Sequence, residues 1–399
     1  MSVLVLLERD ASDGASDAFA PVTTARPLAE VRAGARLVRE RWATALDRPV
    51  AGVIAAPRLT GFEEPGSAPI LSDETMLDAG TMVAYSHFAP ALHQAAAGGA
   101  DTLTHDGVPV ASLLREATSV AALRRGGITA AGTAPHPVTG WMLQHAWDLI
   151  GHLPAMLADD ATTIAMAMQP ARALPDDVRV IGSHPVRLAE TAVIEPFVVL
   201  DASQGAIIIG EHAVVRSFSR LTGPFVLGAH STWVAGSGHT MSIGDHCKIS
   251  GEASTSIICG HANKGHDGFL GHSYLGRWTN LGAGTVTSNL KNTYGPVSFA
   301  GVNTGLQFLG SILGDHAKTG ILTRLTTGSC IGAGANVISD DVVPNVMPAF
   351  AWGSHGERYD RERFLNTATR VMARRQVQMT AGMRGCLGAV HDTACGSAS

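Results

Sequence analysis

The chain has 399 residues, enough for two or three domains, with 45 glycines, 5% aromatic residues and only 16% charged residues. This composition is typical of a narrow solenoid, whose core takes small and branched side chains and whose corners need tight turns. The net charge of -5 and the lack of any run of 18 apolar residues argue against a nucleic-acid-binding protein and against a membrane-spanning one.

Residues 1–172 indicate a mixed α/β domain with a helical linker. Short apolar runs predict buried strands at 3–7 and 50–55, and the charged residues after the first run argue against a signal peptide. Apolar residues at helical spacing predict three helices, at 28–45, 108–125 and 141–157. Five cysteines without paired spacing predict free thiols in a cytoplasmic protein.

Prolines at positions 170 and 175 predict a hinge, after which a repeat fills residues 173–346. An aliphatic residue followed by glycine returns at matched intervals: 18 residues from Ile209 to Leu227, 18 from Leu313 to Ile331, and 6 from Leu275 to Leu281. Three hexapeptide strands per coil predict a left-handed parallel β-helix. An antiparallel sandwich would show period-2 alternation without these intervals.

Two breaks in the repeat, at 221–242 and 289–313, are expected to form loops that project from the solenoid. The remaining residues, 347–399, predict an arginine-rich helix at 357–379. The last twenty residues are rich in glycine, alanine and serine and are expected to form a disordered tail.

The most unusual cluster of polar residues runs from His261 to Gly276 and holds three histidines, a lysine and an aspartate. Acyl transfer from a thioester to an amine needs a base with a near-neutral pKa and donors for the oxyanion. Histidine suits the first role. Backbone amides of the glycine-rich turn at 282–284 suit the second.

The stretch 260–289 resembles the acetyltransferase domain of the bifunctional glucosamine-1-phosphate acetyltransferase / N-acetylglucosamine-1-phosphate uridyltransferase family. Counting back from the Leu-Gly-Ala-Gly-Thr segment at 281–285 places the family's catalytic histidine on His266, and two family asparagines on Asn280 and Asn289. Phe269 and Leu290 replace family tyrosines, which leaves Tyr294 as a substitute for one hydroxyl.

The whole chain is also similar to a sugar nucleotidyltransferase subgroup of this family. The shared motifs are Ala-Arg-Pro-Leu-Ala-Glu-Val-Arg-Ala-Gly at 25–34, Lys-Gly-His-Asp-Gly-Phe-Leu-Gly at 264–271 and Ser-Asn-Leu-Lys-Asn-Thr-Tyr at 288–294. The resemblance implies a Rossmann-like, nucleotidyltransferase-like N-terminal domain before the β-helix. The glycine-rich phosphate loop of nucleotidyltransferases is missing after the first strand. Candidate phosphate or Mg²⁺ ligands are therefore scattered, at Arg26, Arg32 and Arg39 and at Asp10 and Glu30.

The resemblance implies a homotrimer in which late coils line an acetyl-CoA groove near subunit interfaces. Candidate contacts to the acyl-CoA are Ala283, Gly284, Lys318, Thr319 and Arg324, and the arginine-rich helix is a further source of phosphate ligands. Candidate contacts to the acyl acceptor are Lys248, Lys264, Asn280, Asn289 and Tyr294. His266 is the expected base, and Asp267 or His272 is expected to support it.

The sequence thus predicts a cytoplasmic N-acyltransferase that uses acetyl-CoA or another acyl-CoA and acts on an amino sugar phosphate or similar small amine. Three alternatives remain open. The first is Mg²⁺-dependent nucleotidyl transfer by the N-terminal domain. The second is a zinc enzyme of the γ-carbonic-anhydrase type, with His261 and His266 as ligands and His230 or His246 as the third. The third is a scaffold without catalysis.

Overall fold

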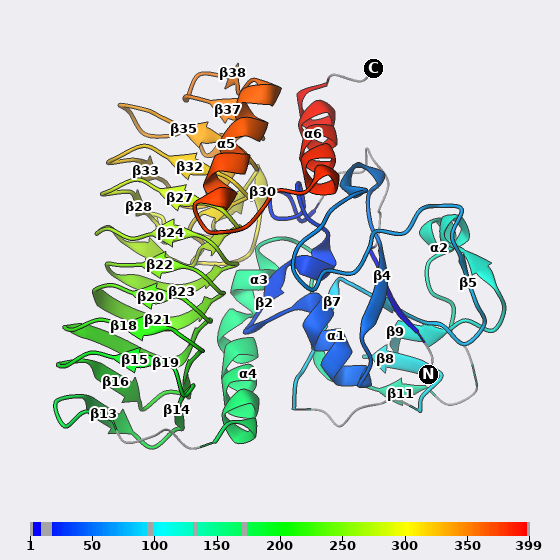
Figure 1. Ribbon diagram of the computed structural model, residues 1–399, viewed down its shortest axis with the longest axis horizontal. Helices are drawn as coiled ribbons and strands as arrows, with labels where there is room; N and C mark the ends of the chain where they lie inside the picture. The colour runs from blue at the N-terminus through cyan, green and yellow to red at the C-terminus, as the bar shows by residue number, and fades with distance from the viewer. Residues whose placement is uncertain are drawn as a thin grey trace.

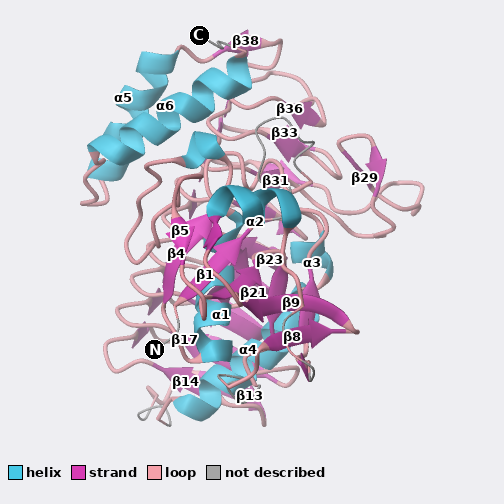
Figure 2. Cartoon of the chain, turned by 90° about the vertical axis from the view of Figure 1, so that its right-hand side faces the viewer, coloured by secondary structure: helices cyan, strands magenta, loops and turns pink. Residues whose placement is uncertain are grey.

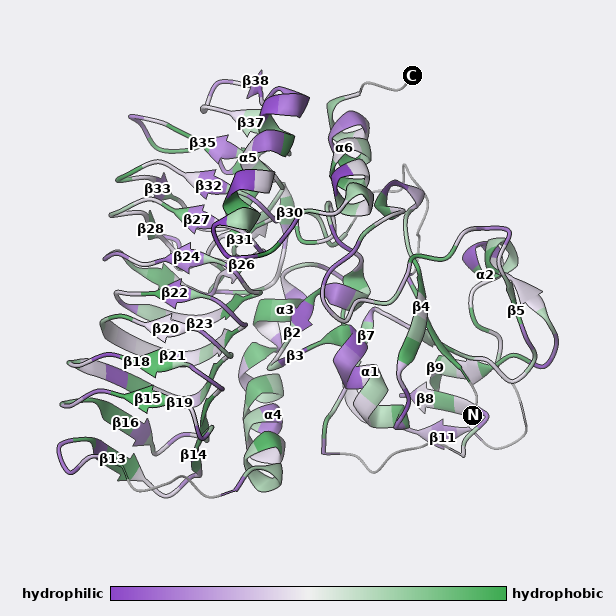
Figure 3. Ribbon diagram, viewed as in Figure 1, coloured by the Kyte–Doolittle hydropathy of each residue, from purple (hydrophilic) through white to green (hydrophobic). Residues whose placement is uncertain are grey.

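In the computed structural model, the described residues are 3–8, 18–93, 99–130, 132, 135–169 and 174–396. A column of short strands forms one side of the molecule and an α/β domain forms the other, with helix α4 (Leu153–Ala167) between them (Figure 1). α4 is apolar along most of its length (Figure 3), because it is packed between the two parts. The expected combination of an α/β domain and a hexapeptide β-helix is confirmed.

The N-terminal domain is built on a six-stranded sheet. Its order is β11 (His136–Pro137), β8 (Thr102–His105), β9 (Val108–Leu113), β6 (Met82–Tyr85), β1 (Leu4–Leu7) and β4 (Val50–Ile54). β1 runs parallel to both β4 and β6, which gives the Rossmann-like centre, whereas β9 is antiparallel to β6 and β8. The strands predicted at 3–7 and 50–55 are confirmed. Shorter pairs complete the domain: β5 (Met76–Leu77) with β10 (Thr118–Ser119), β7 (Phe88–Pro90) with β12 (Gly140–Met142), and β2 (Arg32–Ala33) with β3 (Arg36–Leu37).

The three helices predicted in this domain are wrong in their extents. Residues 28–45 begin with a 3-10 turn, η1 (Leu28–Glu30), and the β2–β3 hairpin around Gly34, whose φ of 59° suits glycine; α1 (Val38–Leu46) follows. Residues 108–125 form β9, β10 and α2 (Val120–Gly126), which Ser119 caps. Residues 141–157 hold the end of β12, α3 (Asp148–Gly151) and the start of α4. A second 3-10 turn, η2, spans Pro57–Leu59.

The solenoid has three faces of parallel strands. One face holds β14 (Val186–Leu188), β17 (Ile207–Ile209), the second halves of β19 (Ser219–Leu227), β21 (Gly236–Ile243) and β23 (Ala253–Ile258), then β26 (Tyr274–Leu275), β31 (Ile312–Leu313), β34 (Cys330–Ile331) and β36 (Val346–Met347). The second holds β15 (Val193–Ile194), β18 (Val214–Val215), β20 (Thr232–Trp233), β22 (Lys248–Ile249), β24 (Asn263–Lys264), β27 (Asn280–Leu281), β32 (Lys318–Thr319), β35 (Asn336–Val337) and β37 (Ala351–Trp352). The third holds β13 (Arg179–Gly182), β16 (Val199–Ala202), the first halves of β19, β21 and β23, then β25 (Leu270–Gly271), β28 (Val286–Thr287) and β33 (Arg324–Leu325).

One aliphatic residue per strand points into the solenoid core, as the repeat predicts. Leu227, Ile243, Ile258, Leu275 and Leu313 pair in register along one face and are fully buried. Their spacing varies because coils differ in length: 16 residues, then 15, then 17, then 38. Only the last of these steps contains a projecting segment.

The two breaks in the repeat have different outcomes. The prediction of a projecting loop at 221–242 is wrong. β19 and β21 pair there and stay within the solenoid wall, and the coil is only shorter than the one before it. The second break is a true insertion. Its hairpin, β29 (Ser298–Phe299) with β30 (Val302–Asn303), projects from the solenoid (Figure 2). Phe299 packs edge-on against Trp147, with ring centroids 5.7 Å apart.

One corner of the solenoid carries a stack of rings that we call the aromatic ladder: His212, His230, His246, His261, Trp278 and His316. Each residue lies in the left-handed region, with φ between 52° and 62°, and belongs to a successive coil. The first four rings are stacked at 4.6–4.7 Å, and Trp278 lies 4.2 Å from His261. His212 and His230 are exposed, whereas His261 and His316 are buried.

The C-terminal segment forms two packed helices, α5 (Arg361–Ala373) and α6 (Ala381–Cys395), which lie across the end of the molecule (Figure 2). The helix predicted at 357–379 begins later than expected, because Glu357–Arg358 forms strand β38 on β37 and Asp360 caps α5. The expected disordered tail is wrong for 381–395. Met383, Cys386, Leu387 and Val390 of α6 are buried in the core that includes the N-terminal domain.

Candidate active site

The residues from Gly265 to Gly268 form an exposed turn at a corner of the solenoid, directly after β24. His266 and Asp267 are exposed at its tip. Gly268 has a φ of 120°, and a Cβ there would lie 2.2 Å from the carbonyl oxygen of Thr285 in the next coil. The sequence therefore places the histidine and aspartate on a tight turn that only glycine allows.

Three polar side chains lie beside this turn. A Cβ at position 265 would lie 3.0 Å from Asn263 Oδ1 and 3.4 Å from Lys248 Cδ, so both side chains reach the base of the turn. Asn263 Nδ2 donates to Asn280 Oδ1 at 2.8 Å. Lys248, Asn263, Asn280 and Lys318 occupy one ladder of residues on the second face. The structure thus places Lys248 and Asn280 on either side of Asn263, a residue at the base of the turn that the sequence analysis missed.

Lys264 is not available as a ligand for a substrate phosphate, in contrast to the expectation. Its side chain is 1% exposed and points into the solenoid core. Its Nζ donates to the backbone carbonyls of Ser250 at 3.3 Å, of Asp267 at 3.1 Å, and of His266. An ammonium has three donors, and all three are used.

His272 does not support His266 through a hydrogen bond. Asn289 Nδ2 donates to His272 Nδ1 at 2.8 Å, and the His272 ring stacks on Phe308 of the inserted loop at 5.2 Å. Burial, with His239 as a lesser cause, lowers the pKa of His272 to about 4, so the ring is neutral near pH 7. Within the part of the chain that the structure describes, the His266 side chain makes no hydrogen bond to any residue, Asp267 included. Tyr294 is exposed on the inserted loop.

The candidate acyl-CoA residues separate into two groups. Ala283 and Gly284 form the corner one coil beyond His266, and their amides have no hydrogen-bond partner among the described residues; the Ala283 carbonyl accepts from Leu322 N. Arg324 is exposed, and its Nη2 donates to the Asp340 carbonyl. Thr319 is 6% exposed and bonds to Thr285 inside the solenoid, so it is not placed to touch a ligand. Lys318 donates to the His316 carbonyl at 2.9 Å, and burial lowers its pKa to about 8.

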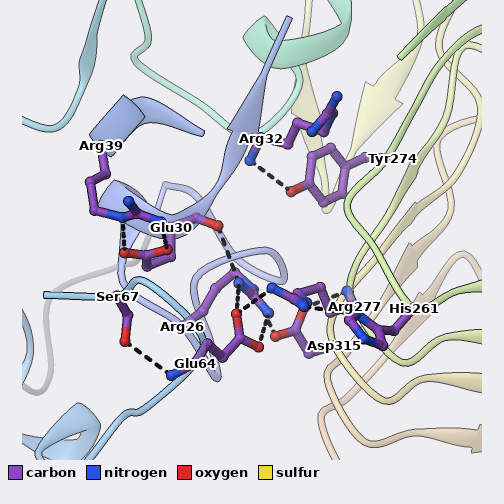
Figure 4. Close-up of polar contacts among 10 residues, drawn as sticks. All are labelled: Arg26, Glu30, Arg32, Arg39, Glu64, Ser67, His261, Tyr274, Arg277 and Asp315. Atoms are coloured by element: carbon purple, nitrogen blue, oxygen red, sulfur yellow. Dashed lines mark hydrogen bonds and ion pairs between the residues drawn. The ribbon is translucent and has the colours of Figure 1, made fainter. Parts of the chain in front are cut away.

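The candidate nucleotide-binding residues lie at the interface with the solenoid. Arg26 is 1% exposed; its Nε lies 2.7 Å from Asp315 and its Nη2 lies 3.1 Å from Glu64 (Figure 4). Arg277 of the solenoid binds the same Glu64 at 2.7 Å. Burial alone would raise the pKa of Glu64, but Arg26 and Arg277 outweigh it and hold the pKa at about 2. This set of charges joins the two domains.

Glu30 and Arg32 are also engaged by protein groups. Glu30 is buried and pairs with Arg39 at 2.7 Å, and Arg32 Nε donates to Ser242 of the solenoid at 2.8 Å (Figure 4 shows both residues). The structure therefore does not gather Arg26, Glu30 and Arg32 around a nucleotide pocket. Asp10 lies outside the described residues. A cavity of about 310 Å³ does lie between β9 and α2, lined in part by Ser112, Arg115 and Glu116.

The histidines considered for zinc belong mainly to the aromatic ladder. Stacked rings present their faces to one another, and His261 Nδ1 is bonded by Arg277 Nη2 at 2.8 Å. Burial lowers the pKa of His261 to about 3, and the positive charge of Arg277 is the second cause of this shift. In the described residues, no three histidine, cysteine or acidic side chains lie close enough to hold a metal ion.

Comparison with known proteins supports the mixed architecture. Residues 11–168 match the family model described as sugar nucleotidyl transferase. Proteins named "Bifunctional protein GlmU" also match part of the chain. One from Bartonella quintana is 26% identical over 174 residues, 42% of this chain and 34% of that protein. One from Methanococcus vannielii is 33% identical over 98 residues, 23% of this chain and 24% of that protein. The chain thus spans about a third or less of the length of these relatives.

Among solved structures, a hexapeptide transferase family protein from Anaplasma phagocytophilum aligns with 50% of this chain and 97% of its own, at 14% identity. Its TM-score of 0.29 is too low to support an inference about fold or function. No helix among the described residues has the length and apolar character needed to cross a membrane.

Proposed function

We propose that this chain is an N-acyltransferase that uses acetyl-CoA or another acyl-CoA. The chain is a relative of the GlmU proteins, and its own N-terminal part matches the sugar nucleotidyl transferase family. Its acceptor is an amino sugar phosphate or a similar small amine. The observation that carries the proposal is the exposed glycine-flanked turn with His266. Lys248 and Asn263 lie at the base of this turn, and the corner of the next coil holds the amides of Ala283 and Gly284, which have no hydrogen-bond partner among the described residues.

In the proposed reaction, the acceptor nitrogen attacks the thioester carbonyl and His266 removes the proton from that nitrogen. The carbonyl oxygen gains negative charge in the tetrahedral intermediate, and the amides of Ala283 and Gly284 are suited to bind it. The carbon–sulfur bond then breaks, and the coenzyme A thiolate accepts the proton from His266. Lys248 supplies a positive charge for an acceptor phosphate, because its ammonium, unlike that of Lys264, is exposed.

The proposal includes a homotrimer whose subunits meet beside the site. Exposed apolar residues support it: on the coil after Ala283–Gly284, Ile321 and Leu322 are 73% and 71% exposed, and Leu322 donates to the Ala283 carbonyl. A bare apolar corner of this kind is typical of a surface that another molecule covers. We also propose a cytoplasmic location, which agrees with five free cysteines.

The deciding experiment measures release of free coenzyme A from acetyl-CoA, with glucosamine 1-phosphate as the first acceptor. A thermal-shift series with acetyl-CoA tests binding separately, because a ligand that binds only the folded state raises the unfolding temperature. A protein that neither binds acetyl-CoA nor releases coenzyme A with any amino sugar phosphate would contradict the proposal.

A second candidate function is Mg²⁺-dependent nucleotidyl transfer, which the family match over residues 11–168 favours. It predicts Mg²⁺-dependent release of pyrophosphate from a nucleoside triphosphate and a sugar 1-phosphate. The engagement of Arg26, Glu30 and Arg32 at the domain interface favours acyl transfer as the main activity.

A further inference from the structure

Lys264 occupies a core position that the neighbouring coils fill with apolar side chains. It pairs with Ile249, which in turn pairs with Trp233, and all three side chains are buried. A lysine at such a position loses hydration of its ammonium, and burial lowers its pKa to about 8 although Asp267 opposes the shift. An apolar residue would fill this core position at a lower cost, so the charge requires an explanation.

The ammonium is the anchor of the turn that carries His266. It accounts for every hydrogen bond to the backbone of His266 and Asp267 among the described residues, by binding both carbonyls. The third donor binds Ser250 in the preceding coil at 3.3 Å, so the turn is tied to the solenoid wall. Gly265 and Gly268 flank the turn and leave its backbone free to adopt many conformations in the absence of such a tie.

We propose that Lys264 is a positioning residue, whose ammonium fixes the backbone of the turn and thereby the direction of the His266 imidazole. The inference rests on the proposed role of His266 in acyl transfer. Lys264 holds two carbonyls toward the core, while the side chains of His266 and Asp267 on the same turn are exposed. A base held in one direction reacts faster than one that samples several.

The test compares Lys264→Met, which keeps the aliphatic stem, with the matched control Leu281→Met, an apolar exchange in the core one coil away. In Lys264→Met, hydrogen exchange is expected to accelerate at least 10-fold at the amides of Ser250 and Leu270, which bond to the carbonyls of Lys264 and Glu252 at the two ends of the turn. The kcat for acetyl transfer is expected to fall about 10- to 100-fold, with the KM for acetyl-CoA within twofold of wild type. Leu281→Met is expected to change neither.

Unchanged exchange at the amides of Ser250 and Leu270 in Lys264→Met would overturn the positioning role, as would an equal loss of kcat in the two variants. Faster exchange in a protein whose wild type transfers no acetyl group would uphold the anchor and defeat only the proposed function. If Lys264→Met does not fold, Lys264→Gln replaces it. Its amide keeps two donors and is expected to give exchange rates between those of wild type and a fully released turn.

Discussion

Arg26 and Asp315 are 289 residues apart in the chain, yet Arg26 Nε donates to the Asp315 carboxylate at 2.7 Å inside the boundary between the two domains. The carboxylate also accepts from the Arg277 backbone amide at 2.9 Å. Breaking a buried pair leaves an uncompensated charge, which costs about 3–5 kcal/mol.

We therefore expect Asp315→Asn to lower the free energy of unfolding by about 3–5 kcal/mol in urea denaturation. Asp101→Asn is the matched control, because its pair with Arg115 is exposed on both sides and such pairs contribute less than about 1 kcal/mol. Equal effects of the two substitutions would show that the buried cluster does not hold the domains together.

His266→Ala is expected to lower kcat for acetyl transfer by a factor of roughly 100 or more, the usual contribution of a general base. Since the side chain is exposed and makes no hydrogen bond to a described residue, the melting temperature should change little. His212→Ala, which removes an exposed histidine from the far end of the aromatic ladder, should leave kcat unchanged. Near-wild-type turnover in His266→Ala would remove it from the mechanism.

Acid is expected to destabilise the protein below about pH 6.5. Burial lowers the pKa of His261 to about 3 and that of His272 to about 4, so the unfolded chain binds more protons than the folded one as the pH falls from 6.5 toward 4. Glu64, with a pKa of about 2, adds to this loss below about pH 4.5. Urea denaturation at pH 7, 6 and 5 measures the slope. His272→Gln should flatten it; an unchanged slope would contradict the neutral state of this ring.

The inserted loop should depend on its contact with the N-terminal domain. Phe299→Ala is expected to cost about 3–5 kcal/mol, because the ring is 2% exposed and packs against Trp147. Amide exchange across 289–311 should accelerate in this variant, whereas exchange in the coil at 207–227 should not. Val302→Ala is the control, since Val302 lies in the same hairpin but is 52% exposed.

Deletion of α6 should damage the core. A chain ending at residue 380 loses four side chains that are at most 2% exposed. Burial of three of them, Met383, Leu387 and Val390, contributes roughly 1.5–3 kcal/mol each. We expect a lower melting temperature and binding of a hydrophobic dye to the exposed surface. Gly385→Ala, at an open position of the same helix, should instead stabilise the protein by about 0.5–1 kcal/mol. A truncated chain as stable as wild type would contradict the packing of α6.

Local sequence patterns predicted the solenoid well because its coils repeat one environment. The Leu227 and Ile331 positions meet the same neighbours in each coil, so period alone identifies them. The N-terminal helices were harder to place, since Gly34 and Ser119 change the chain's direction inside stretches with helical spacing. The prediction of a disordered tail was wrong for another reason. Helix α6 is stabilised by packing against distant residues near Gly61, and composition alone does not reveal such contacts.

The candidate site shows the same division. The His266 cluster was visible because three histidines, a lysine and an aspartate break the repeat. The sequence did not show which of these side chains would be buried. Lys264 is buried and Lys248 is exposed because they lie on opposite sides of their strands. Likewise, Arg26 lies in a family motif that suggested phosphate binding, and only the fold places Asp315 beside it.

The aromatic ladder shows where this molecule can change in length. Successive rings are 18, 16, 15, 17 and 38 residues apart in the chain, yet all of them occupy the same corner with the same left-handed backbone conformation. The 38-residue step from Leu275 to Leu313 adds its extra residues after His261 and Trp278 have stacked and before His316 rejoins the same corner. Differences in coil length are thus accommodated away from this corner, where new loops can be acquired without disturbing the stacked rings.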